Sequence, residues 1–256
     1  MNRKTWLGAL VLGATLGAAL GCAHPMGFQH YGNFSQMMHS GQASGQVALS
    51  ELGREPGVWG VGALADLRGE VIQIDGKLLV SPGSDPQGRV QPAGAQATAT
   101  LFASARVNEW STVPVPSTMD QAQFEAFVKA QAQARKLDTE QAFVFRVTGE
   151  YSQLTWHVVT GEKPTGAAAG HSPQGHGGHG SHGSGHANQQ SGLTIFRHPQ
   201  VSGQLVGVYS GARLEGVVTH PGERFHLHYI DNGMTVSGHV DQYTVRAGSM
   251  LWVPMN

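Results

Sequence analysis

The chain of 256 residues contains a single cysteine, Cys22. One thiol cannot form an internal disulfide, and its lone presence excludes a thiolate metal cluster or a cysteine nucleophile elsewhere in the chain. Charged residues make up only 13% of the sequence, and the 16 lysines and arginines are scattered along it. Without the clustered positive field that nucleic acid requires, we expect no nucleic-acid partner.

An apolar run from Trp6 to Leu20 follows the positively charged residues Arg3 and Lys4. This run has the length of a signal-peptide core and is too short for a comfortable membrane span. It ends in Ala19-Leu20-Gly21-Cys22, which resembles a bacterial lipobox. We therefore expect residues 1–22 to be a signal peptide, the mature protein to be exported to the cell envelope or periplasm, and a lipid on Cys22 to anchor it to the membrane. An ordinary signal peptide with an incidental cysteine is the alternative.

Glycine accounts for 36 residues, which is typical of a turn-rich β protein rather than a helical bundle. Asp75-Gly76 is a strong two-residue hairpin signal, and residues 117–135 have the apolar spacing of a helix with one buried face. Phe143–Val147 and Leu154–Val159 suggest the two strands of another hairpin. The expected fold class is α/β (α+β), with two strand-rich lobes, mixed or antiparallel sheets and a few helices.

Residues 161–192 are nearly all Gly, His, Ser, Ala and Gln, a composition that cannot bury enough apolar surface to become ordered. We expect a disordered linker there, between an N-terminal lobe over residues 23–160 and a C-terminal metal-binding lobe over residues 193–256. The linker could capture zinc, copper or nickel, or it could be a passive insertion. Five histidines lie in it: His171, His176, His179, His182 and His186.

The most informative segment is Phe225-His226-Leu227-His228-Tyr229-Ile230. Strand alternation places His226 and His228 on one face, and a two-residue turn at Asn232-Gly233 would pair His226 directly with His239. A turn longer by one residue would move His239 to the opposite face. Three imidazoles with open positions are typical of a catalytic metal site, for zinc or for iron or manganese. Three unrelated solvated or pH-sensitive histidines are the alternative.

Other short motifs accompany this hairpin through nearly all of the mature chain. They are Phe28-Gln29-His30, Gly60-Val61-Gly62, Arg68-Gly69-Glu70, Asp75-Gly76-Lys77, Phe145-Arg146-Val147-Thr148-Gly149, Leu214-Glu215-Gly216, Pro221-Gly222 and Gly238-His239-Val240. Together with the histidines they resemble the α-acetolactate decarboxylase family. The resemblance implies conversion of 2-acetolactate to acetoin and carbon dioxide by a carbon–carbon lyase. It also implies Zn²⁺ or another divalent metal held by His226, His228 and His239 between two lobes, often in a homodimer.

Two further residues are candidates for catalysis. Glu70 begins a strand and shares a face with Ile72 and Ile74, so it could be a proton donor in a partly apolar cleft or a solvated residue at a hairpin tip. Arg146 lies inside an apolar run, where a charge needs a carboxylate partner, either the substrate or Glu150. The resemblance to the decarboxylases assigns both Glu70 and Arg146 to the active site.

The sequence departs from the family pattern at two places. Ala63 stands where members commonly carry a threonine, and the chain stops at Asn256 without a segment that brings another glutamate to the site. These departures predict slow turnover, altered stereochemistry or a related 2-hydroxy-3-keto acid as substrate. The alternative is a catalytically impaired homologue that binds zinc or copper in the cell envelope. A cupin-like dioxygenase ranks last, because the expected glutamate shortly after the second histidine is absent.

Overall fold

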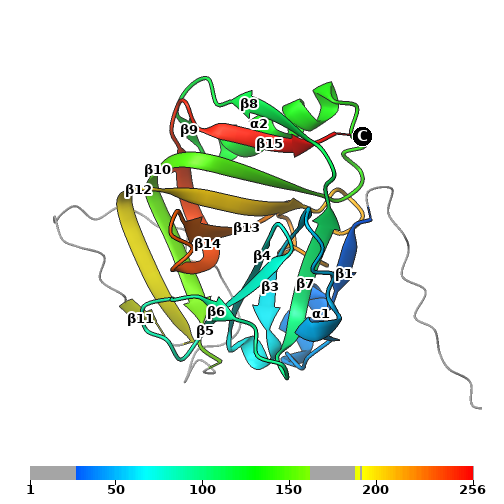
Figure 1. The fold of residues 1–256 in the computed structure, drawn as a ribbon, viewed down its shortest axis with the longest axis vertical. Helices are drawn as coiled ribbons and strands as arrows, with labels where there is room; N and C mark the ends of the chain where they lie inside the picture. The colour runs from blue at the N-terminus through cyan, green and yellow to red at the C-terminus, as the bar shows by residue number, and fades with distance from the viewer. Residues whose placement is uncertain (1–26, 162–187, 191, 256) are drawn as a thin grey trace, which may run out of the picture.

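The computed structural model describes residues 27–161, 188–190 and 192–255, which form two antiparallel sheets (Figure 1). The first sheet is built from the N-terminal part of the chain and contains seven strands. In spatial order these are β1 (Gln29–Tyr31), β7 (Thr98–Arg106), β3 (Val58–Leu64), β4 (Gly69–Ile74), β5 (Lys77–Pro82) and β6 (Gln91–Pro92), with β2 (Val47–Ala48) also paired to β7.

The second sheet has eight strands, and an additional pairing of β10 with β12 closes four of them into a ring. Its order is β11 (Asn188–Gln190), β12 (Leu193–Tyr209), β13 (Phe225–Asp231), β14 (Ser237–Val245), β10 (Phe143–Val159), β15 (Met250–Pro254) and β8 (Trp110–Pro114), with β9 (Met119–Asp120) paired to β14.

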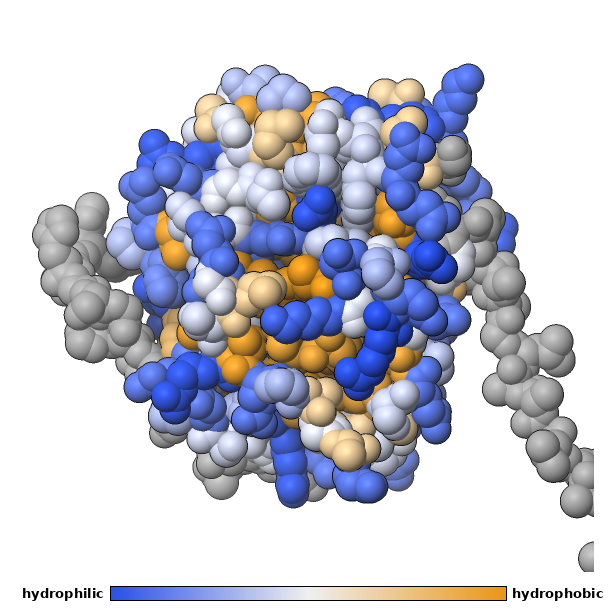
Figure 2. All heavy atoms as spheres, in the orientation of Figure 1, coloured by the Kyte–Doolittle hydropathy of each residue, from blue (hydrophilic) through white to orange (hydrophobic). Residues whose placement is uncertain are grey.

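Three apolar clusters hold this arrangement together, and the third of them is formed by the N-terminal part of the chain alone. The first is rich in aromatic side chains of the ring strands, including Tyr151, Trp156 and Tyr229. The second joins the sheets: Ile72 of the first sheet packs in one cluster with Val206 and Ile230 of the second. Successive strand residues point to opposite faces, so on β13 Leu227 and Tyr229 pack in the first cluster and Ile230 packs in the second. On the face seen in Figure 2, apolar side chains show in a band across the middle of the molecule.

The strand-rich fold is confirmed, and every strand pairing in the described residues is antiparallel. The described residues contain two α-helices, α1 (Phe34–Ser40) and α2 (Gln121–Ala134), and two short 3₁₀ segments, η1 (Leu49–Glu51) and η2 (Ala65–Leu67). The predicted Asp75-Gly76 hairpin is present, joining β4 to β5. Helix α2 begins after Asp120, whose side chain forms a capping box with Gln123. None of the described helices is long and apolar enough to cross a membrane.

The hairpin predicted from Phe143 to Val159 is wrong, because these residues form the single 17-residue strand β10. Strand β12 provides partners from Tyr209 opposite Phe143 to Leu193 opposite Val159, with an interruption at Gln153. Gly149, which lies between the two predicted strands, pairs with Gly203 of β12, so its backbone groups have partners without a turn. Its φ of 153° extends the strand.

All described strands before residue 107 belong to the first sheet, and all described strands after residue 109 belong to the second. From the sequence, we instead predicted the boundary between the two lobes at the linker. Strands β8 and β10 and helix α2 therefore belong with the C-terminal strands. Within the expected linker, residues 188–190 form β11 against β12, so this part is not the structureless segment that was predicted. The residues expected to form a signal peptide, with Cys22, and the tract over residues 162–187 lie outside the described residues.

Candidate active site between the two sheets

His226 and His228 lie on the face of β13 that points toward the first sheet. Their neighbours Leu227 and Tyr229 point the other way, into the aromatic core of the ring. The two histidines are buried, with exposed fractions of 8% and 0%. Burial lowers the pKa of both imidazoles well below the usual value of 6.5, so they are neutral at neutral pH. Neutral imidazole is the form that binds metals.

The pairing of His226 with His239 is wrong, because the loop of the hairpin is longer than predicted. Asp231 pairs with Val236, leaving four residues, 232–235, in the loop. His239 therefore lies directly opposite His228. The pairing has shifted by two positions, and a shift by an even number keeps the side chain on the same face. The three histidines consequently still converge.

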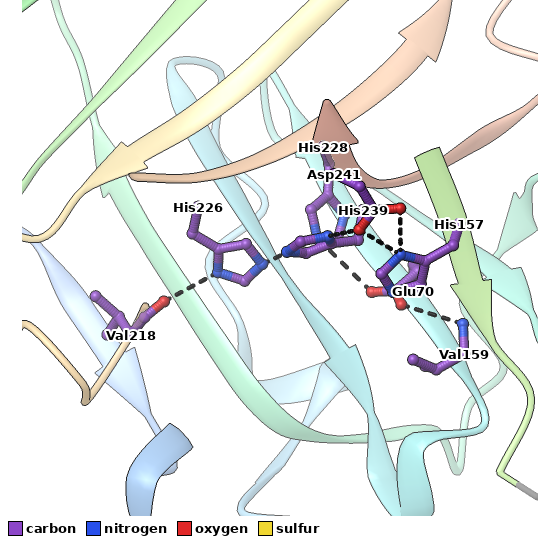
Figure 3. Close-up of polar contacts among 8 residues, drawn as sticks. All are labelled: Glu70, His157, Val159, Val218, His226, His228, His239 and Asp241. Atoms are coloured by element: carbon purple, nitrogen blue, oxygen red, sulfur yellow. Dashed lines mark hydrogen bonds and ion pairs between the residues drawn. The ribbon is translucent and has the colours of Figure 1, made fainter. Parts of the chain in front are cut away.

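The three rings form a compact triangle (Figure 3). Ring centroids are 5.1 Å apart for His226 and His228, 5.1 Å for His226 and His239, and 5.7 Å for His228 and His239. The Nε2 atoms of His226 and His228 are 3.2 Å apart. Two nitrogens bound tetrahedrally to zinc at about 2.0–2.1 Å would lie about 3.3 Å apart, which is close to this spacing.

The carbonyl of Val218 fixes the orientation of His226, because it accepts a hydrogen bond from Nδ1 at 3.0 Å. With the proton on Nδ1, the lone pair is on Nε2, directed toward His228. This outer hydrogen bond is the usual support of a metal-binding histidine. His226 and His228 are therefore arranged as two ligands of one divalent metal would be.

Glu70 joins the site from the first sheet. It is only 4% exposed, and its Oε2 lies 3.6 Å from Nε2 of His228. The backbone amide of Val159 donates to Oε1 at 3.3 Å. Burial raises the pKa of Glu70 to about 7, although His157 and the Val159 hydrogen bond oppose this rise. The alternative of a solvated residue at a hairpin tip is thus wrong. Ala63 stands directly opposite Glu70 on β3.

Two further polar residues lie at the site that were not among the candidates predicted from the sequence. His157 lies directly opposite His239 on β10, and Asp241 follows on the same face of β14. Asp241 accepts from Nδ1 of His157 at 2.8 Å, and its Oδ1 lies 3.5 Å from Nδ1 of His239. Burial opposes ionisation of Asp241, but the hydrogen bond from His157 and the nearby imidazole of His239 hold its pKa below the ordinary range. Strand alternation could have placed His157 and Asp241 on the same side as His239. That inference requires knowing that β10 pairs with β14, which the sequence alone does not show.

The structure places Arg146 apart from the histidines. It shares a row across the sheet with Val206 and His228, so the apolar Val206 stands between them. Its guanidinium lies 4.0 Å from the ring of Trp252 and 4.6 Å from that of Trp59, contacts that stabilise a cation.

Arg146 lines an open cleft of about 610 Å³ together with Gln204. Its Nε and the Nε2 of Gln204 are buried and have no hydrogen-bond partner among the described residues. Glu150, one expected partner of Arg146, instead lies 3.6 Å from Arg246. Two unpaired donors in one cleft leave Arg146 available to an acceptor from solution.

The fold and the site define a two-sheet protein with a buried centre of imidazoles and carboxylates between the sheets. A sequence model of the alpha-acetolactate decarboxylases matches residues 28–169 and 185–256. The chain belongs to this family, whose members are carboxy-lyases.

Solved structures show the same fold. Alpha-acetolactate decarboxylase from Bacillus subtilis strain 168 is 17% identical with a TM-score of 0.64, covering 90% of this chain and 87% of that one. The acetolactate decarboxylase of Bacillus subtilis subspecies spizizenii is 18% identical with a TM-score of 0.66, covering 90% and 88%. A Staphylococcus aureus protein of unknown function, described as similar to the decarboxylase, is 15% identical with a TM-score of 0.62, covering 90% and 86%. No curated protein sequence matches the chain.

Proposed function

We propose that this protein is a metal-dependent decarboxylase that converts 2-acetolactate to acetoin and carbon dioxide. The observation that carries the proposal is the buried carboxyl of Glu70, 3.6 Å from His228, in a chain of the decarboxylase family. His226, His228 and His239 would hold Zn²⁺ or another divalent metal. When bound, such a metal supplies a Lewis acid that withdraws electron density from the keto and hydroxyl oxygens of the substrate.

Glu70 is proposed as the proton donor. Loss of carbon dioxide leaves an electron pair on the substrate carbon, and acetoin forms when that carbon gains one proton. Glu70 is buried and comes from the sheet opposite the histidines, so it approaches a substrate held there from one side. Donation from one side gives one configuration of acetoin, and solvent then returns the proton to Glu70.

Arg146 is proposed to bind the substrate carboxylate before it departs. Its side chain starts from the same sheet face as His228, and its Nε has no partner in the described part of the chain. A guanidinium can hold a carboxylate through two parallel hydrogen bonds. For this role the guanidinium must turn from the tryptophans toward the histidines when the substrate binds.

We also propose that the protein is exported and anchored through a lipid on Cys22, on the evidence of the N-terminal sequence. Expression with a labelled fatty acid tests this. The wild-type chain should carry the label and sediment with membranes, whereas the Cys22→Ser variant should do neither. Fatty-acid label on the Cys22→Ser variant, or no label on the wild-type chain, would contradict a lipid anchor on Cys22.

The experiment for the decarboxylase is acetoin formation from racemic 2-acetolactate by the purified, zinc-loaded chain. His228→Ala should abolish turnover, while His39→Gln, a change at an exposed histidine on α1, should leave it unchanged. If the folded chain binds zinc at this site but forms no acetoin, the lyase is wrong, and the alternative of an envelope zinc- or copper-binding protein stands.

A further inference from the structure

The site contains more metal-binding side chains than one metal needs. Three imidazoles complete the protein ligands of a single catalytic zinc. His157 and Asp241 lie beside these three, and the decarboxylation proposed above gives neither a role. One ligand atom from each of His157, His239 and Asp241 lies within 4.8 Å of the other two. This second group shares only His239 with the first.

We propose that His157, Asp241 and Nδ1 of His239 form a second divalent-metal position, so that the His239 imidazole stands between two metals. A donor set of two imidazoles and one carboxylate suits zinc or copper. The second metal position is not required for the proposed decarboxylation. The two proposals are linked only because both use His239 as a metal ligand.

The place of His239 in the cluster supports a bridging role. Its ring centroid lies 4.9 Å from that of His157 and 5.1 Å from that of His226, so it stands between the two groups (Figure 3). Its Nδ1 is buried, lies 3.5 Å from Asp241 and makes no hydrogen bond in the described residues. An imidazole can bind one metal through each nitrogen. Binding the second metal releases the remaining ring proton to solvent, which leaves a bridging imidazolate.

The contact of His157 with Asp241 must open slightly to admit a metal. These atoms are 2.8 Å apart, whereas two ligands at about 2.0–2.2 Å from a tetrahedral zinc lie about 3.3–3.5 Å apart. A shift of this size requires only small side-chain rotations. The side chain of Asp241 is 37% exposed and that of His157 is 12% exposed, so an ion can reach the position from solvent.

Metal stoichiometry tests the proposal. The parent protein is the full chain with His171, His176, His179, His182 and His186 changed to glutamine, which removes competing ligands outside the described fold. After dialysis against zinc, native mass spectrometry should find two zinc ions per parent chain. His157→Gln and Asp241→Asn should each leave one, and His226→Ala should also leave one. Thermal unfolding of each variant checks that it remains folded.

Two results would overturn the second position. One is a parent that binds a single zinc, with Asp241→Asn weakening its affinity but not its number, since Asp241 then only orients His239. The other is two zinc ions that persist in the folded His157→Gln and Asp241→Asn variants. Copper loading adds a direct signature of the bridge: electron paramagnetic resonance should show an exchange-coupled pair in the parent and isolated copper in Asp241→Asn. Absence of acetoin would count against the decarboxylase and leave these results intact.

Discussion

Glu70 and His228 come from different sheets, yet Oε2 of Glu70 lies 3.6 Å from Nε2 of His228. The contact exists only when the sheets are packed together through the cluster that contains Ile72 and Val206. The candidate active site is therefore a product of the interface, and the packing of that apolar cluster sets its geometry. A ligand that binds only the packed form should stabilise the whole fold.

Glu70→Gln should leave the structure and zinc binding intact but reduce the rate of acetoin formation by about 10²–10⁴-fold. The amide has the size of the carboxyl and cannot donate the proton. Steady-state kinetics and zinc titration measure the two effects. Glu55→Gln makes the same chemical change at an exposed position and should have no effect. Equal rates for Glu70→Gln and wild type would remove Glu70 from the reaction.

Arg146→Lys should raise the KM for 2-acetolactate by about tenfold, because lysine keeps the charge but loses the paired donors. Arg106 is an exposed arginine that lines the same cleft, so Arg106→Lys is the matched control and should behave as wild type. Kinetic constants for both variants decide the assignment. An unchanged KM in Arg146→Lys would show that the guanidinium stays among the tryptophans.

Gly238→Ala should lower the free energy of unfolding by about 1–3 kcal/mol. A Cβ at this position would overlap the carbonyl oxygen of His157 and would lie 2.6 Å from the Trp156 ring, so β14 must move away from β10. Gly94→Ala meets open space and should be nearly neutral. Urea unfolding followed by tryptophan fluorescence measures both. A neutral Gly238→Ala would mean that the two strands are not packed as described.

Asp231→Ala should destabilise the protein by about 1–2 kcal/mol at pH 7, because the carboxylate accepts from the amides of Thr235 at 2.6 Å and Val236 at 2.9 Å. Burial opposes ionisation of Asp231, but these hydrogen bonds lower its pKa below the ordinary value of 3.8. A lowered pKa in the folded state gives stability that is complete above the unfolded value and is lost as the pH falls through the folded value.

The difference in stability between wild type and Asp231→Ala should therefore be full near pH 7 and shrink as the pH falls below about 3.8. Unfolding measured at several pH values gives this difference directly. A difference that stays constant from pH 7 to pH 3 would show that the Asp231 carboxylate does not hold the loop.

Local patterns predicted those features that local chemistry decides. The Asp75-Gly76 hairpin follows from backbone preferences, and the shared face of His226 and His228 follows from strand alternation. The register of His239 could not be predicted, since the Asn232-Gly233 signal competes with side-chain hydrogen bonds from Asp231 that favour a longer loop.

Other features depend on partners that are distant in sequence. The unbroken β10 requires β12 as a continuous neighbour, and the approach of His157 to His239 requires β10 to pair with β14. The same dependence explains Arg146, whose surroundings are tryptophans from three separate strands: Trp59, Trp110 and Trp252. A residue's own segment contains no information about such neighbours.

The most direct test of a metal-dependent decarboxylase is removal and return of the metal, with acetoin formation from 2-acetolactate as the readout. The account predicts that the chain stripped with a chelator stays folded and inactive, that zinc or another divalent metal restores turnover, and that His228→Ala is not restored. Equal acetoin formation by the stripped and the reloaded protein would contradict the metal's part in the reaction, and no acetoin from the folded, metal-loaded wild type would contradict the decarboxylase.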